Sequence, residues 1–150
     1  NVKTKKGFCV IDFGVRNRGY CSDITRMVYV GKPSNREKEI YNFLLAIQKN
    51  AITQIKSNKK CSELYGFVVK NLKNYQKYFT HGLGHGVGVE IHELPNLTLN
   101  SNDRIKNNMV FTIEPGIYVP KRFGIRIEDT VLYKNKTTAL TKTSKDLIII

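Results

Sequence analysis

Four acidic residues stand inside runs that otherwise have the composition of apolar β-strands, and they limit the possible folds of this chain more than any other feature. They are Asp12, Asp23, Glu114 and Glu128. The runs are rich in β-branched and aromatic residues and cover 8–13, 22–30, 109–119 and 125–133. A carboxylate is costly to remove from water unless it is paired or coordinated. Each acid therefore lies either in solvent at a strand end or edge, or at a site where the four share a cation.

The first two runs predict a β-hairpin over 8–30, and the pattern after it becomes helical. Ser34 and Glu37 have the spacing of a capping box, and apolar residues recur at helical spacing behind it. This pattern predicts a long amphipathic helix over 34–57, and a weaker repeat of it predicts a shorter helix over 62–72. Short final strands are expected at 139–141 and 147–150.

These elements follow the order hairpin, helix, helix, hairpin, and each hairpin carries two of the four acids. The order predicts an α+β fold built on an internal repeat of two helices and a hairpin, from which the first pair of helices is absent. The length of 150 residues fits one domain of ordinary size and excludes two large domains. We therefore expect residues 1–150 to form a single incomplete domain.

The charge of the chain is strongly positive, with 25 Lys and Arg against 12 Asp and Glu, a net charge of +13. Such a charge would attract nucleic acid, an acidic membrane or an acidic protein. The lysines are dispersed and no motif interleaves them with aromatic residues, so nucleic-acid binding is disfavoured. No apolar stretch approaches the ~18 residues of a membrane span, so no membrane partner is expected.

The three cysteines, Cys9, Cys21 and Cys61, are odd in number and have no CxxC spacing. This pattern favours neither a disulfide framework nor a thiolate zinc site. A reducing compartment fits it best, and we expect a cytoplasmic protein.

The three histidines, His81, His85 and His92, fall close together among glycines that occupy every second position from 82 to 88. Glycine at alternate positions removes side chains from one face, so that backbone or a ligand can approach closely. The alternative is a flexible glycine loop with incidental histidines. Two other motifs are excluded, because 92–96 lacks the second histidine of HExxH and the glycines match neither the dinucleotide-binding nor the phosphate-loop spacing.

One imidazole and four carboxylates make a hard, oxygen-rich ligand set. Such a set suits two divalent ions such as Mn²⁺, Co²⁺ or Zn²⁺ better than a single structural zinc. A Ca²⁺ loop is disfavoured because the acids are spread over 12–128 rather than packed in one short loop. A pair of metal ions that activates water indicates hydrolytic chemistry.

Four motifs, taken together, resemble those of the pita-bread (creatinase/aminopeptidase) metallopeptidases. They are IDFG (11–14) with YCSDITR (20–26), HGLGHGVGVEIHE (81–93), TIEPGIY (112–118) and GIRIEDT (124–130). Within this family the chain is most similar to the Xaa-Pro dipeptidases (prolidases) and Xaa-Pro aminopeptidases. Methionine aminopeptidases share the fold and the ligands, so a methionine aminopeptidase-like activity is an alternative, but SDITR, GHGVG and GIRIEDT are closer to the Xaa-Pro branch.

The resemblance implies a metal site with five ligands. Asp23 and Glu128 would bridge two divalent ions, His85 and Glu114 would complete one of them, and Asp12 would chelate the other. The resemblance favours Mn²⁺ or Co²⁺, with Zn²⁺ or Fe²⁺ as further possibilities.

The same resemblance assigns the catalytic and substrate-binding residues. Glu114 would be the general base, and His92 would steady the scissile carbonyl and the intermediate. His81, His92 and Arg126 would line the substrate pocket. The implied activity is hydrolysis of the Xaa-Pro bond of dipeptides or peptide N-termini.

Two departures from the family bear on this expectation. Its members carry an N-terminal domain and, ahead of the IDFG strand, two helices and a loop with one more substrate-binding histidine. That part is absent from this sequence. It would come from a separate partner chain or an upstream segment, or else the gene is truncated, and the sequence does not distinguish these. The resemblance also implies a homodimer. Some relatives have lost catalysis and bind proteins instead. They lose the ligands, whereas all five are present in this chain.

Overall fold

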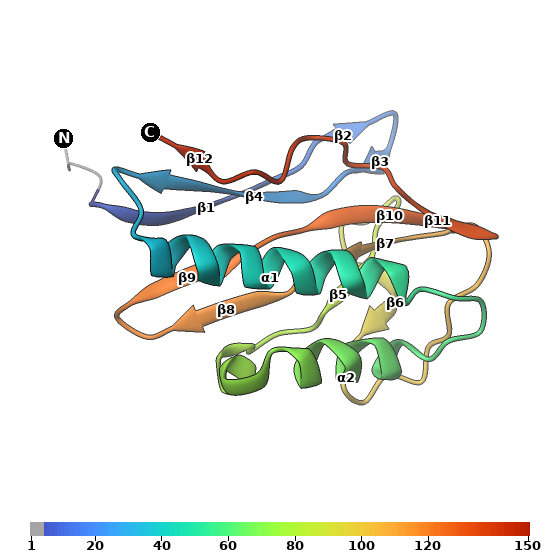
Figure 1. The fold of residues 1–150 in the computed structure, drawn as a ribbon. Helices are drawn as coiled ribbons and strands as arrows, with labels where there is room; N and C mark the ends of the chain where they lie inside the picture. The colour runs from blue at the N-terminus through green and yellow to red at the C-terminus, as the bar shows by residue number, and fades with distance from the viewer. Residues whose placement is uncertain (1–4) are drawn as a thin grey trace.

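The structure is a computed structural model and describes residues 5–150. Its strands form two main sheets and two short ribbons, and its two α-helices lie on one side of the sheets (Figure 1). One sheet has the order β1-β4-β12 and the other has the order β11-β10-β7-β5-β6. The elements are β1 Gly7–Phe13, β2 Arg16–Asn17, β3 Tyr20–Cys21, β4 Ile24–Val30, α1 Asn35–Thr53, α2 Cys61–Asn71, a 3-10 helix Lys73–Tyr78, β5 Gly84–Gly86, β6 Glu93–Leu97, β7 Met109–Ile113, β8 Gly116–Val119, β9 Phe123–Arg126, β10 Asp129–Lys134, β11 Lys136–Ala139 and β12 Ile148–Ile149.

Both predicted hairpins are present, and each is a long antiparallel pair of strands with a short two-stranded ribbon inserted between them. In the first hairpin β1 pairs with β4, and the ribbon β2-β3 lies between them in the chain. In the second, β7 pairs with β10, and the ribbon β8-β9 lies between them. This common plan supports the internal repeat expected from the sequence.

The second hairpin corrects the expectation of one continuous run over 125–133. Strand β9 ends at Arg126 and pairs with β8, whereas β10 begins at Asp129 and pairs with β7. The chain changes partner strand between these two residues. Glu128 therefore leaves the regular ladder, which frees its side chain to turn inward.

The capping box predicted before the first helix is confirmed. The side-chain oxygen of Ser34 accepts from the Glu37 N–H at 3.3 Å, and the Glu37 carboxylate accepts from the Ser34 N–H at 2.7 Å. Helix α1 ends at Thr53, earlier than expected, because the chain then turns and the Asn58 N–H donates to Ile105 O at 2.8 Å. Helix α2 lies within one residue of its predicted bounds.

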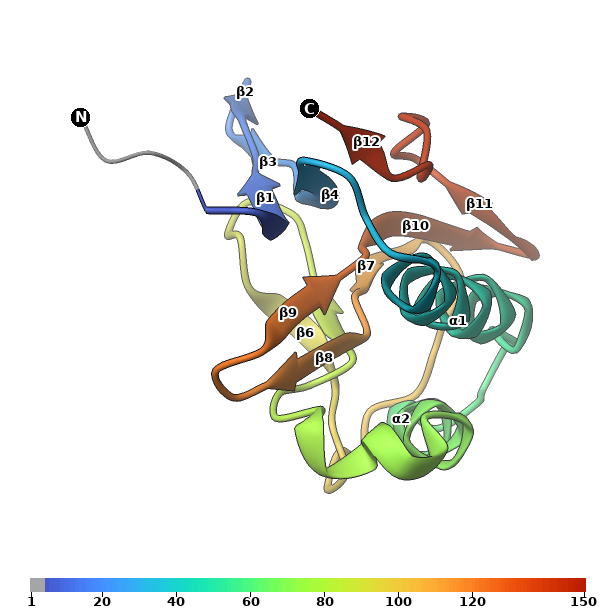
Figure 2. The same ribbon diagram turned by 60° about the vertical axis from the view of Figure 1, so that its left-hand side comes forward.

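Helix α1 lies at the centre of the molecule, beneath the β1-β4 hairpin and above α2 in Figure 1. Its buried face carries Tyr41, Leu44, Ile47 and Ala51. In Figure 2, which looks along α1, the helix lies between β10 and α2. The core therefore extends from both sheets through α1 to α2, with Leu64 and Val68 fully buried on α2.

Residues 84–86 of the glycine-rich segment form strand β5, so this part of the segment is not a loop. A side chain at Gly84 would collide with the backbone of Thr112 on β7, and one at Gly86 would collide with the backbone of Leu94. Only glycine lets the neighbouring chain segments approach this closely. The sequence analysis placed no element over 93–97, where the structure has strand β6. This strand contains Pro95 and lies at the sheet edge, where a missing N–H is tolerated.

The final strands are β11, which begins three residues before the expected 139, and β12, which lies within the expected 147–150. Among residues 5–150, neither helix is long and apolar enough to cross a membrane.

Candidate metal and active site

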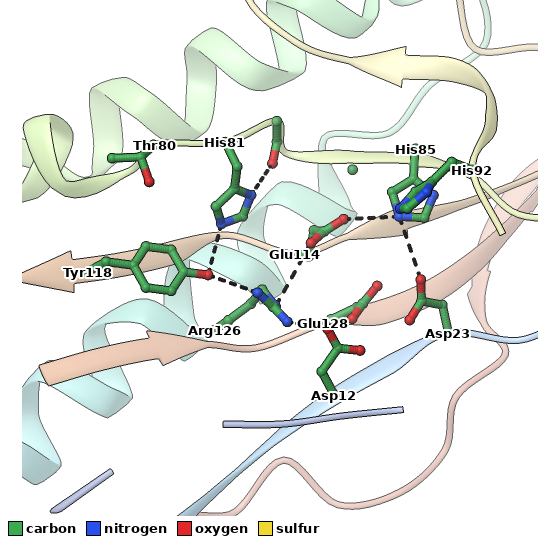
Figure 3. A pocket seen from close by; sticks show the side chains of 12 residues that line it. Asp12, Asp23, Thr80, His81, His85, His92, Glu114, Tyr118, Arg126 and Glu128 are labelled. Carbon is green, nitrogen blue, oxygen red and sulfur yellow. Dashed lines mark hydrogen bonds and ion pairs between the residues drawn. The ribbon is translucent and has the colours of Figure 1, made fainter. Parts of the chain in front are cut away.

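The eight side chains singled out in the sequence line one cavity of about 500 Å³ (Figure 3). They are Asp12, Asp23, His81, His85, His92, Glu114, Arg126 and Glu128. The cavity lies where the two hairpins meet β5. The fold therefore brings together residues from nearly the whole length of the chain.

The acids reach this cavity because most of them stand where a strand begins or ends. Asp23 directly precedes β4, Glu128 directly precedes β10, and Glu114 directly follows β7. Asp12 lies near the end of β1, opposite Thr25 of β4. At these positions the backbone leaves one strand pairing for the next, so the carboxylates turn into the space between the two hairpins.

His85 presents its Nε2 atom to two of the acids. This atom lies 3.6 Å from Asp23 Oδ2 and 3.4 Å from Glu114 Oε1. On the other side of the ring, Nδ1 lies 3.0 Å from the carbonyl oxygen of Gly86, which can only accept a hydrogen bond. Nδ1 therefore carries the hydrogen, and Nε2 offers its lone pair, as a metal-binding histidine does.

Three donor atoms, one each from Asp23, His85 and Glu128, lie within 4.8 Å of one another. Glu114 joins this group through its contact with His85 and is held by Thr112. The Thr112 hydroxyl accepts from the His85 backbone N–H at 3.0 Å and donates to Glu114 Oε1 at 3.0 Å. Sequence reasoning did not identify Thr112, although it belongs to the motif TIEPGIY.

The carboxylates are crowded and poorly solvated. Burial raises the pKa of Glu114 to about 7. Burial, with the negative charge of Glu114, raises the pKa of Glu128 to about 8, and burial also raises the pKa of Asp23. Within the described part of the chain, Oε1 of Glu128 is buried with no hydrogen-bond partner. A cation would compensate the negative charge of these carboxylates and would bind the Glu128 oxygen that has no partner. The residues present therefore fit a divalent metal.

Asp12 lies apart from this donor group and is half exposed. Its carboxylate forms an ion pair with Nη2 of Arg126. Arg126 also donates from Nε to Thr25 Oγ1 and from Nη1 to Tyr118 Oη, each at 3.1 Å. The Arg126 side chain therefore extends from β9 to the first hairpin and connects the two hairpins along one side of the cavity.

His81 is fixed by a chain of hydrogen bonds that ends at Arg126. Its Nδ1 lies 2.7 Å from the carbonyl oxygen of Gly82, so Nδ1 is the donor and Nε2 accepts from the Tyr118 hydroxyl at 3.0 Å. Burial lowers the pKa of His81. Sequence reasoning missed Tyr118, whose signal was its place in TIEPGIY, four residues after Glu114.

His92 lies on the segment between β5 and β6 and reaches the cavity from the solvent side. Its ring is exposed and packs edge-on against His85, with ring centroids 4.1 Å apart. It is thus placed at the mouth, beside the metal-ligand candidate rather than within the donor group (Figure 3).

Comparison with known proteins places these features in one family. Residues 2–135 match the model of metallopeptidase family M24. A Xaa-Pro dipeptidase of Pyrococcus horikoshii is 46% identical over 143 residues, which are 93% of this chain and 40% of that protein. The chain therefore spans about 40% of the length of its curated relatives and corresponds to their C-terminal part.

Solved structures agree with the sequence match. The prolidase of Pyrococcus horikoshii superposes with a TM-score of 0.92 at 42% identity, covering 98% of this chain and 44% of that one. The X-Pro aminopeptidase of Thermotoga maritima superposes with a TM-score of 0.90 at 36% identity, covering 95% and 42%.

Proposed function

The chain belongs to metallopeptidase family M24, and from this membership we propose that it is the C-terminal part of an exopeptidase that hydrolyses the Xaa-Pro bond of dipeptides or of peptide N-termini. The α+β pita-bread fold expected from the sequence is confirmed, beginning here at the first hairpin of the repeat. Membership in this family implies divalent metal ions and a peptide substrate.

The observation that carries the proposal is the donor group itself. Asp23, His85 and Glu128 converge within 4.8 Å, and a buried Glu128 oxygen lacks a partner in the described structure. We assign these three residues, with Glu114 and Asp12, as the ligands of two divalent ions, Mn²⁺ or Co²⁺ before Zn²⁺ or Fe²⁺. When bound, such ions supply Lewis acidity and lower the pKa of water.

Glu114 is the proposed general base. Thr112 holds its Oε1, while Oε2 faces the cavity, 4.0 Å from Nε of Arg126. A carboxylate with one oxygen held by a hydroxyl and the other facing the cavity can accept a proton from water and later give it to the departing amine. His92, at the cavity mouth, is placed to donate a hydrogen bond to the carbonyl oxygen as negative charge develops there.

Arg126, Tyr118 and His81 form the proposed substrate wall. The hydrogen-bond chain through these three residues holds them in one arrangement before substrate binds. Such preorganisation lowers the entropic cost of positioning the peptide. The bond before proline is a tertiary amide without an N–H, so a site that acts through the carbonyl and a shaped pocket does not need that donor.

We further propose that residues 1–150 are an incomplete catalytic domain and that the rest comes from an upstream segment or a partner chain. Two observations support this: the chain spans about 40% of its relatives, and the outward face of the first hairpin is apolar and exposed. On that hairpin Phe13, Val15 and Tyr20 are 55%, 64% and 65% exposed. The missing part would cover this face, complete the pocket and carry the homodimer contacts expected of the family.

The free Cys9, Cys21 and Cys61 are consistent with the proposed cytoplasmic location.

The test is the release of free proline from a Xaa-Pro dipeptide after Mn²⁺ or Co²⁺ is added. The chain is assayed alone and with the N-terminal part of a homologous Xaa-Pro dipeptidase, and Glu114→Gln is the matched control. We expect metal-dependent release that Glu114→Gln lacks, and the added part should increase it. Equal turnover by Glu114→Gln would refute the base assignment. Release of methionine from a Met-Ala-Ser peptide without release of proline would support the methionine aminopeptidase-like alternative.

A further inference from the structure

Asp129 follows the proposed ligand Glu128 but points away from the cavity into the protein. Its side chain is 0% exposed, and it forms an ion pair with Nη2 of Arg26 at 2.9 Å. Burying a carboxylate this completely is costly unless every oxygen is paired. Its other partners are Thr141 at 2.8 Å, Gln48 at 3.0 Å and the ammonium group of Lys145.

Arg26, the ion-pair partner of Asp129, lies on the first hairpin, three residues after the proposed ligand Asp23. Its Nη1 donates to the backbone carbonyl of Glu128 and, at 3.0 Å, to that of Thr25. Its Nε donates to the carbonyl of Ser144 at 3.1 Å. One buried guanidinium therefore holds the backbone of the ligand on the opposite hairpin.

Two threonines complete the connection in both directions. Thr130 Oγ1 donates to the backbone carbonyl of Asp23 at 2.7 Å, and Thr25 Oγ1 donates to the Glu128 carboxylate at 2.6 Å. Thr25, two residues after Asp23, thus holds Glu128. Thr130, two residues after Glu128, holds Asp23.

This connection is needed because β4 and β10 are not neighbours in one ladder. They belong to different sheets, and the Glu128 N–H to Thr25 O bond at 3.3 Å is a weak backbone link between them. The separation of Asp23 from Glu128 therefore depends on side chains rather than on strand pairing.

We propose that the Arg26–Asp129 ion pair, together with Thr130, is a positioning device that sets Asp23 and Glu128 at metal-binding separation. The proposal rests on the proposed function, in which both acids are metal ligands. It also gives the C-terminal segment 141–145 a part in the site, because this segment supplies Thr141, Lys145 and the Ser144 carbonyl.

The expected effect of loosening this network is a loss of metal affinity. Partners that orient metal ligands typically change affinity by about 10- to 100-fold when removed. Asp129→Asn leaves the buried Arg26 and Lys145 charges without their carboxylate, so it is expected to lower stability as well as metal affinity. Thr130→Val keeps the ion pair, so this variant separates positioning from stability.

The test is a Co²⁺ titration of the full chain, followed by the visible absorption of bound cobalt. Asp129→Asn and Thr130→Val are compared with wild type. Thr130→Val is nearly isosteric and removes only the hydroxyl that holds Asp23. We expect affinities about 10- to 100-fold lower and an altered cobalt spectrum. In Thr130→Val, whose ion pair is intact, the melting temperature of the metal-free protein should change less than cobalt binding raises the melting temperature of wild type.

Two controls separate positioning from stability. Val68→Ala creates a cavity in α2, away from the site, and should lower the melting temperature while leaving the cobalt spectrum unchanged. Thr137→Val makes the same chemical change as Thr130→Val on β11 and should leave both unchanged. If Asp129→Asn does not fold, Thr130→Val decides the question alone.

Two outcomes would overturn the proposal, and they are distinguishable. If wild type binds cobalt and both folded variants bind it within twofold with the same spectrum, positioning is refuted while the proposed function stands. If wild type binds no divalent ion, the ligand assignment and this inference fail together.

Discussion

Gly84→Ala should damage the site through the backbone rather than through any lost side chain. An alanine Cβ at this position would lie 2.7 Å from the carbonyl carbon of Thr112 and 2.8 Å from its Oγ1, and closer still to its carbonyl oxygen. Ordinary contacts begin at 3.4 Å, so β5 and β7 must move apart by at least about 0.7 Å. That movement displaces His85, the next residue.

The magnitudes follow from this displacement. Overpacking of this kind costs about 1–3 kcal/mol of unfolding free energy, which lowers the melting temperature of a chain of this size by roughly 2–12 °C. A displacement approaching ~1 Å at a reacting group can cost about 100-fold in rate, and we expect a comparable loss of metal affinity.

The assay is thermal unfolding together with Mn²⁺ titration, and Gly66→Ala is the matched control. Gly66 lies within α2, and nothing is within 4 Å of an added Cβ there. Because alanine favours helix, Gly66→Ala should stabilise the protein by about 0.5–1 kcal/mol and leave metal binding unchanged. If Gly84→Ala matches wild type in both measurements, the close contact between β5 and β7 does not position His85.

Three further predictions concern other parts of the chain. The hydrogen bond from Ser34 is the main cause that lowers the pKa of Glu37 from 4.5 to about 2. The ionised Glu37 should stabilise the fold fully above pH 4.5, and this stabilisation should be lost as the pH falls toward 2. The free energy of unfolding of Glu37→Gln should therefore depend less on pH over that range than that of wild type. Burial raises the pKa of the Cys61 thiol to about 11, so a thiol reagent should modify exposed Cys9 in the native protein and reach Cys61 only on unfolding, as mass spectrometry would show. Tyr118→Phe removes the hydroxyl that accepts a hydrogen bond from the Arg126 guanidinium. The kcat/KM for proline release by the completed enzyme should therefore fall by about 10- to 100-fold, while metal affinity stays unchanged. Equal kcat/KM would show that this hydroxyl does not position substrate.

The elements that sequence reasoning found are those with strong local signals. The capping box at Ser34 and Glu37 and the helical spacing behind it are local features, and they specify α1. The acids in apolar runs pointed to one shared site because their burial needs a cation. All eight candidate residues line the cavity, although their individual roles remain predictions.

The features that sequence reasoning missed depend on contacts between distant segments. The pattern over 125–133 alternates as one strand would, and only the pairing of β9 with β8 and of β10 with β7 shows where it breaks. The pattern of apolar and polar residues around Asp129 would be the same for an acid in a buried ion pair and for an acid that faces solvent. Its partners Arg26 and Lys145 lie 103 and 16 residues away, so only the folded structure identifies the network.

The number of metal ions bound per chain tests the proposed site most directly. Isothermal titration of the metal-free chain with Mn²⁺ should show two ions per chain, and Glu128→Gln, which removes one bridging carboxylate charge, should bind fewer ions or bind them at least about 10-fold more weakly. A wild-type chain that binds no divalent ion, or a Glu128→Gln variant with unchanged stoichiometry and affinity, would contradict the assignment of this cavity as a two-metal centre.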